Sequence, residues 1–249
     1  MNPRTVDASQ GWQWIVNGFA IFRKGALMWI AMTLLLTVMW LVVLIVPLIG
    51  PLLFNLVTPV FFAGILLGCR TVEQGGELEL PVLFAGFKSN IAALITVGGV
   101  YLVGTIIIIG IVLITVGMSA FTLTKSGAGI DLDSALALLR SVSTGLLIAA
   151  ALYIPLMMAI WFAPALIVFD NFGALDAMKL SFAACVKNML PFLVYGLVVM
   201  VLWIIASIPL LLGLLILLPV LFCSVYTSYT DIFRPASGTL ANPANSLLI

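Results

Sequence analysis

The sequence contains no histidine and very few charged residues. Charged residues make up 8% of the 249 residues and hydrophobic residues make up 64%, whereas a soluble domain holds about 25% and roughly 45–50%. This balance excludes a water-soluble fold, because a core buried in water needs a charged shell. The net charge of only +1 also excludes a basic surface for nucleic acid. We therefore expect membrane lipid to surround this chain.

Metal and cofactor sites are not expected either. Without histidine, and with three cysteines that lack a CxxC spacing, the sequence offers no ligand set for zinc, haem or a di-iron centre. Cys69, Cys185 and Cys223 are predicted to be reduced thiols that pack as small apolar residues. No GxSxG, P-loop or HExxH pattern occurs. The sequence thus predicts a protein that is not an enzyme and that holds no cofactor.

Six apolar runs are long enough to cross about 30 Å of hydrocarbon as helices. They cover approximately residues 26–46, 52–68, 91–118, 144–169, 191–207 and 210–229, and none contains a charged residue. Reversals rich in proline and glycine separate the first two runs and the last two. Residues 119–143 are predicted as a loop, in which Asp133 caps a short helix that contains Leu136, Leu139 and Arg140. The predicted fold is all-α, with three hairpins in one transmembrane domain over residues 1–229 and a disordered cytoplasmic tail over 230–249.

A short amphipathic segment precedes each predicted hairpin. FAIFRKG starts at Phe19, FAGFKSN at Phe84 and FAACVKN at Phe182, and a basic residue follows each phenylalanine. Apolar residues at helical spacing around these motifs are typical of a helix that lies in the headgroup layer. For the first segment, an N-terminal extension of the first span is the alternative. The predicted apolar faces are Trp12, Ile15, Phe19 and Phe22; Leu80, Leu83, Phe84 and Phe87; and Leu175, Met178, Phe182, Cys185 and Met189.

The same pattern suggests an internal repeat. Shifting residues 19–50 by 163 positions gives ten identities in 32 positions, more than the three or four that composition alone predicts. After a short gap, Pro59 meets Pro219 and Phe62 meets Phe222. The repeat units would cover residues 11–68, 79–169 and 174–229, the middle unit being the least regular. Repeats of one orientation are related by an axis along the membrane normal.

The basic residues predict the orientation. Eight of the ten lysines and arginines fall on one side of the predicted spans, and Lys125 and Arg140 fall on the other. Because cytoplasmic loops carry the excess of basic residues, both termini are predicted to face the cytoplasm.

Two sets of residues are candidate functional sites. The first set is predicted to contact lipid or a partner protein, because its basic residues lie at the depth of anionic headgroups. Each basic residue contributes about 1 kcal/mol of binding free energy there. The alternative is that these residues only mark topology. It comprises Phe19, Arg23, Lys24, Phe84, Lys88, Lys179, Phe182 and Lys187. The second set, Asn55 and Thr58, lies within the second span. These two side chains either form hydrogen bonds between helices or line a polar cavity.

Two stretches carry a resemblance to a known family, RTVDASQGWQW at residues 4–14 and APALIVFDNFGALDAMKLSFAACVKNMLPF at residues 163–192. They resemble an uncharacterised family of proteobacterial inner-membrane proteins of about this length. More distantly, the layout is similar to the membrane domain attached to some glycerophosphodiester phosphodiesterases. The hydrolase domain is not in this sequence, so its activity is not implied. The resemblance implies a bacterial inner-membrane location and a six-span fold, and it brings no catalytic residues.

Two functions remain open. The leading hypothesis is a non-enzymatic protein that organises membrane lipids or a partner complex, or associates with itself, through cytoplasmic amphipathic helices. The alternative is a transporter or facilitator of a small or apolar solute along a central pseudo-threefold axis. Spans without ionisable groups argue against an ion-coupled carrier and against an intramembrane enzyme.

Overall fold

The computed structural model describes residues 2–47, 49–125, 132–209 and 211–234. The secondary-structure elements among these residues are all helices, with no strand. The all-α prediction is confirmed. In chain order the elements are α1 (Gln10–Arg23), α2 (Ala26–Val43), α3 (Ile49–Glu73), the 3₁₀ helix η1 (Leu80–Lys88), α4 (Ile91–Lys125), α5 (Leu132–Trp161), α6 (Ala163–Asp170), α7 (Ala174–Lys187), α8 (Met189–Ser207) and α9 (Leu214–Phe233).

Six helical segments within the described residues are long and apolar enough to cross a membrane, as predicted. They are α2, α3, residues 91–118 of α4, residues 136–170 of α5 and α6, α8 and α9. The expectation that the spans contain no charge is wrong at their ends. Because no helix-breaking residue follows the apolar runs directly, the helices continue into polar sequence. Arg70, Glu73, Arg140, Asp170 and Asp231 therefore lie within these helices.

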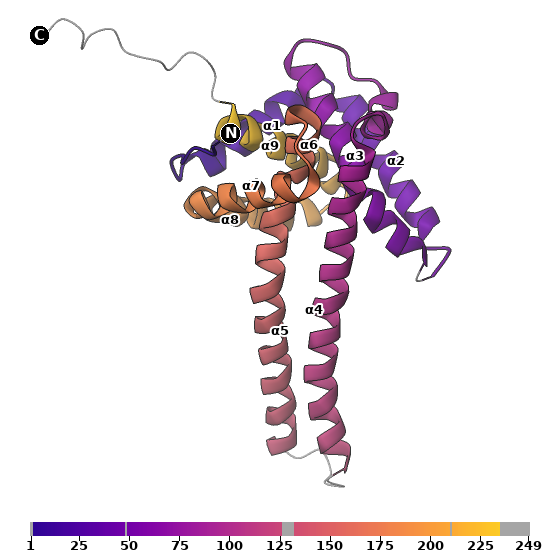
Figure 1. The fold of residues 1–249 in the computed structure, drawn as a ribbon, viewed down its shortest axis with the longest axis vertical. Helices are drawn as coiled ribbons and strands as arrows, with labels where there is room; N and C mark the ends of the chain where they lie inside the picture. Colours follow the sequence, from indigo (N-terminus) through magenta and orange to yellow (C-terminus); the bar gives the residue numbers. More distant parts are fainter. Residues whose placement is uncertain (1, 48, 126–131, 210, 235–249) are drawn as a thin grey trace, which may run out of the picture.

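The predicted loop at residues 119–143 is wrong at both ends. Helix α4 continues to Lys125, and α5 begins at Leu132, so the predicted short helix with Leu136, Leu139 and Arg140 is the first part of α5, where alanine and leucine favour helix. Figure 1 shows α4 and α5 running side by side and extending away from the other helices. The Tyr101 and Tyr153 hydroxyls, 3.1 Å apart, and a bond from Ser141 Oγ to the Thr115 carbonyl at 3.0 Å join the pair.

Helix α9 lies at the centre of the remaining bundle. More of it is buried than of any other candidate span, and it contacts α1, α2, α3 and α8. Phe62 of α3 meets Phe222 of α9 edge to face at 6.1 Å, and the Sγ atoms of Cys69 and Cys223 lie 3.6 Å apart. Of these two contacts, the Phe62–Phe222 pair joins residues that the repeat makes equivalent, and the repeat itself stays a prediction.

The buried face of α1 overlaps only in part with its predicted apolar face. Of the predicted apolar residues, Ile15 and Phe22 are buried, whereas Trp12 and Phe19 are exposed. The buried stripe instead includes Gly11, Trp14, Gly18 and Ile21. At Gly18 the helix lies directly against the α9 backbone, where a Cβ atom would come within 2.7 Å of the Ser224 nitrogen. Hydropathy patterns miss this face because glycine adds nothing to them although it permits the closest packing.

Helices α7 and η1 show the same arrangement. The buried face of α7 is Ala177, Met178, Ser181, Ala184 and Cys185, whereas Leu175, Phe182 and Met189 of the predicted apolar face are exposed. In η1 only Leu83 and Gly86 are buried. Their spacing of three residues matches the three residues per turn of a 3₁₀ helix. Helix η1 packs on α3, where Gly64 faces the Leu83 backbone.

The last helix extends past the predicted span. Helix α9 ends at Phe233, four residues after the predicted end at Tyr229, and Arg234 closes it with a backbone bond to the Thr230 carbonyl at 2.9 Å. The rest of the predicted tail, residues 235–249, lies outside the described residues.

Candidate functional site

The three phenylalanines of the repeated motif share one environment. Phe19 on α1, Phe84 on η1 and Phe182 on α7 are 44%, 42% and 41% exposed. These values are similar although the three helices pack against different partners. Large aromatic side chains left this exposed by a membrane protein are available to lipid or to another protein.

Basic side chains accompany each of these phenylalanines. The Arg23 guanidinium lies 5.8 Å from the centre of the Phe19 ring, and Lys88 and Lys187 end η1 and α7. Lys179 makes only a long, exposed contact of 3.9 Å with Asp176, which contributes little. We call Phe19, Arg23, Phe84, Lys88, Lys179, Phe182 and Lys187 the amphipathic surface. Lys24, the eighth residue of the predicted set, belongs to a different site.

That site is a polar pocket of about 700 Å³ between the N-terminal segment, α1, α3 and α9. Four basic and two acidic side chains line it, so its walls carry a net positive charge. The charged lining residues are Arg4, Lys24, Arg70, Glu73, Asp231 and Arg234. The pocket lies where two candidate spans, α3 and α9, end.

The acidic residues around the polar pocket are held by aromatic donors. The Tyr226 hydroxyl donates to Glu73 Oε2 at 2.6 Å. The Trp14 indole N–H donates to Asp231 Oδ2 at 2.9 Å, and the Arg4 guanidinium pairs with the same carboxylate. Both acids are therefore already engaged from within the bundle.

A second network closes the pocket on the side of α6. Asp170 accepts bonds from the Tyr229 hydroxyl and, at 2.6 Å, from Arg234 Nη2. This bond raises the pKa of Arg234, so its charge persists at any ordinary pH. Arg234 and Arg70 also lie 5.7 and 5.5 Å from the centre of the Phe169 ring. Neither Arg70 nor Lys24 forms an ion pair with any described residue.

Asn188 positions the N-terminal segment at the pocket. Its fully buried side chain accepts a bond from the Val6 N–H at 2.9 Å and donates to the carbonyls of Arg4 and Ala184 at 3.0 and 2.9 Å. The amide thereby connects the end of α7 to the extended backbone before α1. Arg4 reaches Asp231 from this fixed backbone.

Ser181 stabilises the break between α5 and α6. Pro164 lies in the first turn of α6, where proline is tolerated, and Phe162 separates the two helices. The fully buried Ser181 hydroxyl accepts a bond from the Phe162 N–H at 2.9 Å and donates to the Met158 carbonyl at 2.7 Å. Ser181 on α7 thus provides hydrogen-bond partners for the backbone groups at the break between α5 and α6.

Asn55 and Thr58 line a central cavity of about 410 Å³ enclosed by α3, α4, α5, α6, α8 and α9. Its walls are mostly apolar. The Asn55 amide donates to the Pro51 carbonyl at 2.9 Å and the Thr58 hydroxyl to the Phe54 carbonyl at 2.7 Å, so both bond within their own helix. The Trp161 indole N–H at this cavity is buried and has no hydrogen-bond partner among the described residues.

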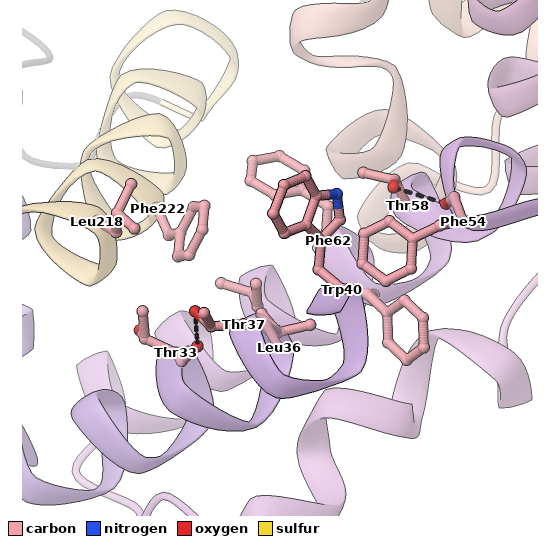
Figure 2. A pocket seen from close by; sticks show the side chains of 11 residues that line it. Thr33, Leu36, Thr37, Trp40, Phe54, Thr58, Phe62, Leu218 and Phe222 are labelled. Carbon is pink, nitrogen blue, oxygen red and sulfur yellow. Dashed lines mark hydrogen bonds between the residues drawn. The ribbon is translucent and has the colours of Figure 1, made fainter. Parts of the chain in front are cut away.

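A smaller apolar pocket of about 250 Å³ opens between α2, α3 and α9. Figure 2 shows Thr37 of α2 bonded back to the Thr33 carbonyl and Thr58 to the Phe54 carbonyl. Phe62, Phe222 and Thr58 line both this pocket and the central cavity. The two spaces are therefore neighbours that share one aromatic pair.

A comparison with known proteins places the chain. It is 28% identical over 241 residues to a protein of Burkholderia thailandensis named as a probable inner membrane protein, and the match covers 93% of this chain and 85% of that protein. The chain is a multi-pass inner-membrane protein. The resemblance noted in the sequence is thereby confirmed. No family model matches the chain, and no solved structure matches it.

Sequence reasoning missed most of the polar pocket of this inner-membrane protein. It used Arg4, Arg70 and Arg234 only to predict the orientation of the chain. Separations of more than 150 residues between Arg4 and Asp231, and between Tyr226 and Glu73, leave no local pattern to find. One signal was available, because an acid stands at or near the end of α3, α6 and α9.

Proposed function

We propose that this inner-membrane protein is a non-enzymatic organiser of membrane lipids that acts through its amphipathic surface. The observation that carries the proposal is the matched exposure of Phe19, Phe84 and Phe182, each on a short helix that also bears basic residues. Burial of one phenylalanine in the acyl layer contributes about 1.5–3 kcal/mol. A neighbouring basic residue adds about 1 kcal/mol on an anionic leaflet.

In the proposed orientation both termini face the cytoplasm. Arg4, Lys24, Arg70 and Arg234 line one pocket at the ends of α3 and α9, whereas Arg140 lies in the α4–α5 pair that extends away from it (Figure 1). This distribution agrees with basic residues gathered at the inner leaflet. A reporter fused after Ile249 is expected to be active in the cytoplasm, and periplasmic activity would overturn the orientation.

Charge reversal on α7 tests the lipid function. In nanodiscs of mixed phosphatidylglycerol and phosphatidylcholine, the wild type is expected to enrich spin-labelled phosphatidylglycerol around itself. The pair Lys179→Glu and Lys187→Glu should remove much of that enrichment, because two attractive charges become repulsive. The matched pair Lys179→Arg and Lys187→Arg keeps the charge and should behave like the wild type. Equal enrichment in all three proteins would refute the proposal.

A facilitator of an apolar solute is the second candidate, favoured by the central cavity beside Asn55 and Thr58. Its apolar walls suit an uncharged solute. If the cavity conducts such a solute, proteoliposomes that contain the protein should take up the solute faster than empty vesicles. Asn55→Leu should change this rate, because it removes a polar amide from the cavity wall. Wild-type flux equal to that of empty vesicles across a panel of uncharged solutes would eliminate this candidate.

A further inference from the structure

We infer that the polar pocket binds a phosphate group, with Lys24 and Arg70 as its principal ligands. The inference deepens the proposed function, on which it rests for the source of that phosphate, an anionic phospholipid headgroup. Of the four basic residues in the pocket, two are neutralised: Arg4 by Asp231 and Arg234 by Asp170. Lys24 and Arg70 have no acidic partner among the described residues.

The acids of the pocket compensate these two charges only in part, because Glu73 is the one lining carboxylate without a basic partner and the pocket keeps a net positive charge. Glu73 accepts the Tyr226 hydroxyl at 2.6 Å and Asp231 accepts the Trp14 indole N–H at 2.9 Å. Neither carboxylate comes within 4.0 Å of Lys24 or Arg70. A charged donor facing a pocket without a carboxylate partner favours an anion from outside. Because the fixed pairs surround the pocket, anion binding requires no ion pair to break.

Arg70 is also held in place for such a contact. It belongs to the last turn of α3, is half-buried and lies over the Phe169 ring. Arg234 lies over the same ring while bonded to Asp170. A guanidinium that lies over an aromatic ring keeps its N–H donors free, because these donors point outward in the plane of the guanidinium. Planar donors of this kind bind phosphate in a bidentate manner, and the Lys24 ammonium supplies a point charge.

Position and size select the ligand class. The pocket lies where the candidate spans α3 and α9 end, at the depth where phospholipid headgroups are found. Its volume of about 700 Å³ exceeds that of a single ion several-fold, since one water takes about 30 Å³. A headgroup with its glycerol fits this space. A phosphorylated solute presents the same chemistry from the cytoplasm, and the experiment separates the two sources.

Lipid titration of the full-length protein in neutral detergent, followed by native mass spectrometry, tests the site. Phosphatidylglycerol should bind the wild type with one tight site above a background of weak adducts. Lys24→Gln and Arg70→Gln should each weaken the tight site about tenfold or more, as expected for loss of a charge-assisted bond. Arg140→Gln is the matched control, because Arg140 belongs to α5 and lies outside both the pocket and the amphipathic surface.

Inorganic phosphate distinguishes the source. Competition by millimolar phosphate for the tight site would assign it to a soluble phosphorylated ligand, whereas a site resistant to phosphate but sensitive to Lys24→Gln is a lipid site. Arg70→Lys should recover part of the affinity, and an unchanged melting temperature shows that Arg70→Gln is folded. Equal affinity of wild type, Lys24→Gln and Arg70→Gln, or no tight site in the wild type, would overturn the inference.

The two proposals fail separately. If pocket variants bind like the wild type while the double glutamate substitution on α7 still reduces phosphatidylglycerol enrichment, the amphipathic surface works without the pocket. If the α7 variants have no effect but Lys24→Gln and Arg70→Gln remove one tight site, the pocket binds phosphate and the proposed organising function is wrong.

Discussion

Replacement of Ser181 by alanine should loosen the break between α5 and α6. The variant deletes a buried hydroxyl that accepts the Phe162 N–H at 2.9 Å and donates to the Met158 carbonyl at 2.7 Å. The Phe162 N–H then lacks this partner in a region closed to water, while the Met158 carbonyl keeps a weak bond from the Cys185 thiol at 3.6 Å. An unsatisfied buried group costs about 1–3 kcal/mol, while hydrogen bonds in membrane proteins average about 0.6 and reach about 1.7 kcal/mol. Loss of the Ser181 hydroxyl therefore predicts a destabilisation of about 1–3 kcal/mol.

Unfolding in mixed micelles of dodecyl sulfate and neutral detergent measures this free energy. Hydrogen exchange adds a local readout, because the Phe162 amide should exchange roughly 5- to 150-fold faster in Ser181→Ala. Ser207→Ala is the matched control, since that hydroxyl donates only to Trp203 in its own helix. A loss below about 0.5 kcal/mol with unchanged Phe162 exchange would show that Ser181 does not hold the break.

Three further substitutions or modifications test other contacts. Gly18→Ala should cost about 1–3 kcal/mol by pushing α1 off α9, whereas Gly196→Ala, with open space around it, should be neutral or slightly stabilising; equal effects would contradict the packing. Iodine should oxidise Cys69 and Cys223, whose Sγ atoms lie 3.6 Å apart, to an intramolecular disulfide seen by peptide mass spectrometry and lost in Cys69→Ser. Burial raises the pKa of Cys185 to about 12. Maleimide should therefore label Cys185 at least about 100-fold more slowly than a free thiol at pH 8, and the labelling rate should rise with pH. Fast labelling at pH 8 would refute the burial of Cys185.

Hydropathy alone predicted the spans because lipid imposes one requirement on them. A helix that crosses hydrocarbon must be apolar over its whole length, and the hydropathy of the sequence shows this property directly. Helix ends follow a different rule. They depend on where the backbone can continue, so α3 extends past Gly68 to Glu73 and α4 continues to Lys125, through residues that a hydropathy boundary assigns to loops.

The buried faces of the short helices could not be predicted in the same way. Gly18 on α1 and Ala184 on α7 are buried, whereas Phe19 and Phe182, each next to or near them, are exposed. In water the larger apolar residue would point inward. In a membrane the outside is apolar as well, so small residues take the protein interface and large ones face lipid. Phe19 and Phe182, which the sequence predicts as contact residues, are thus exposed.

The carboxylates at the helix ends connect fold and site. Glu73, Asp170 and Asp231 stand in the last turns of α3, α6 and α9, where the helix dipole opposes a negative charge. Each is offset by an aromatic donor from a neighbouring helix: Tyr226, Tyr229 or Trp14. Because two of these carboxylates also pair with Arg4 and Arg234, the acids serve the bundle itself. Lys24 and Arg70 outnumber the one unpaired carboxylate, Glu73, so a positive charge remains at the pocket and is available to a ligand from outside the chain.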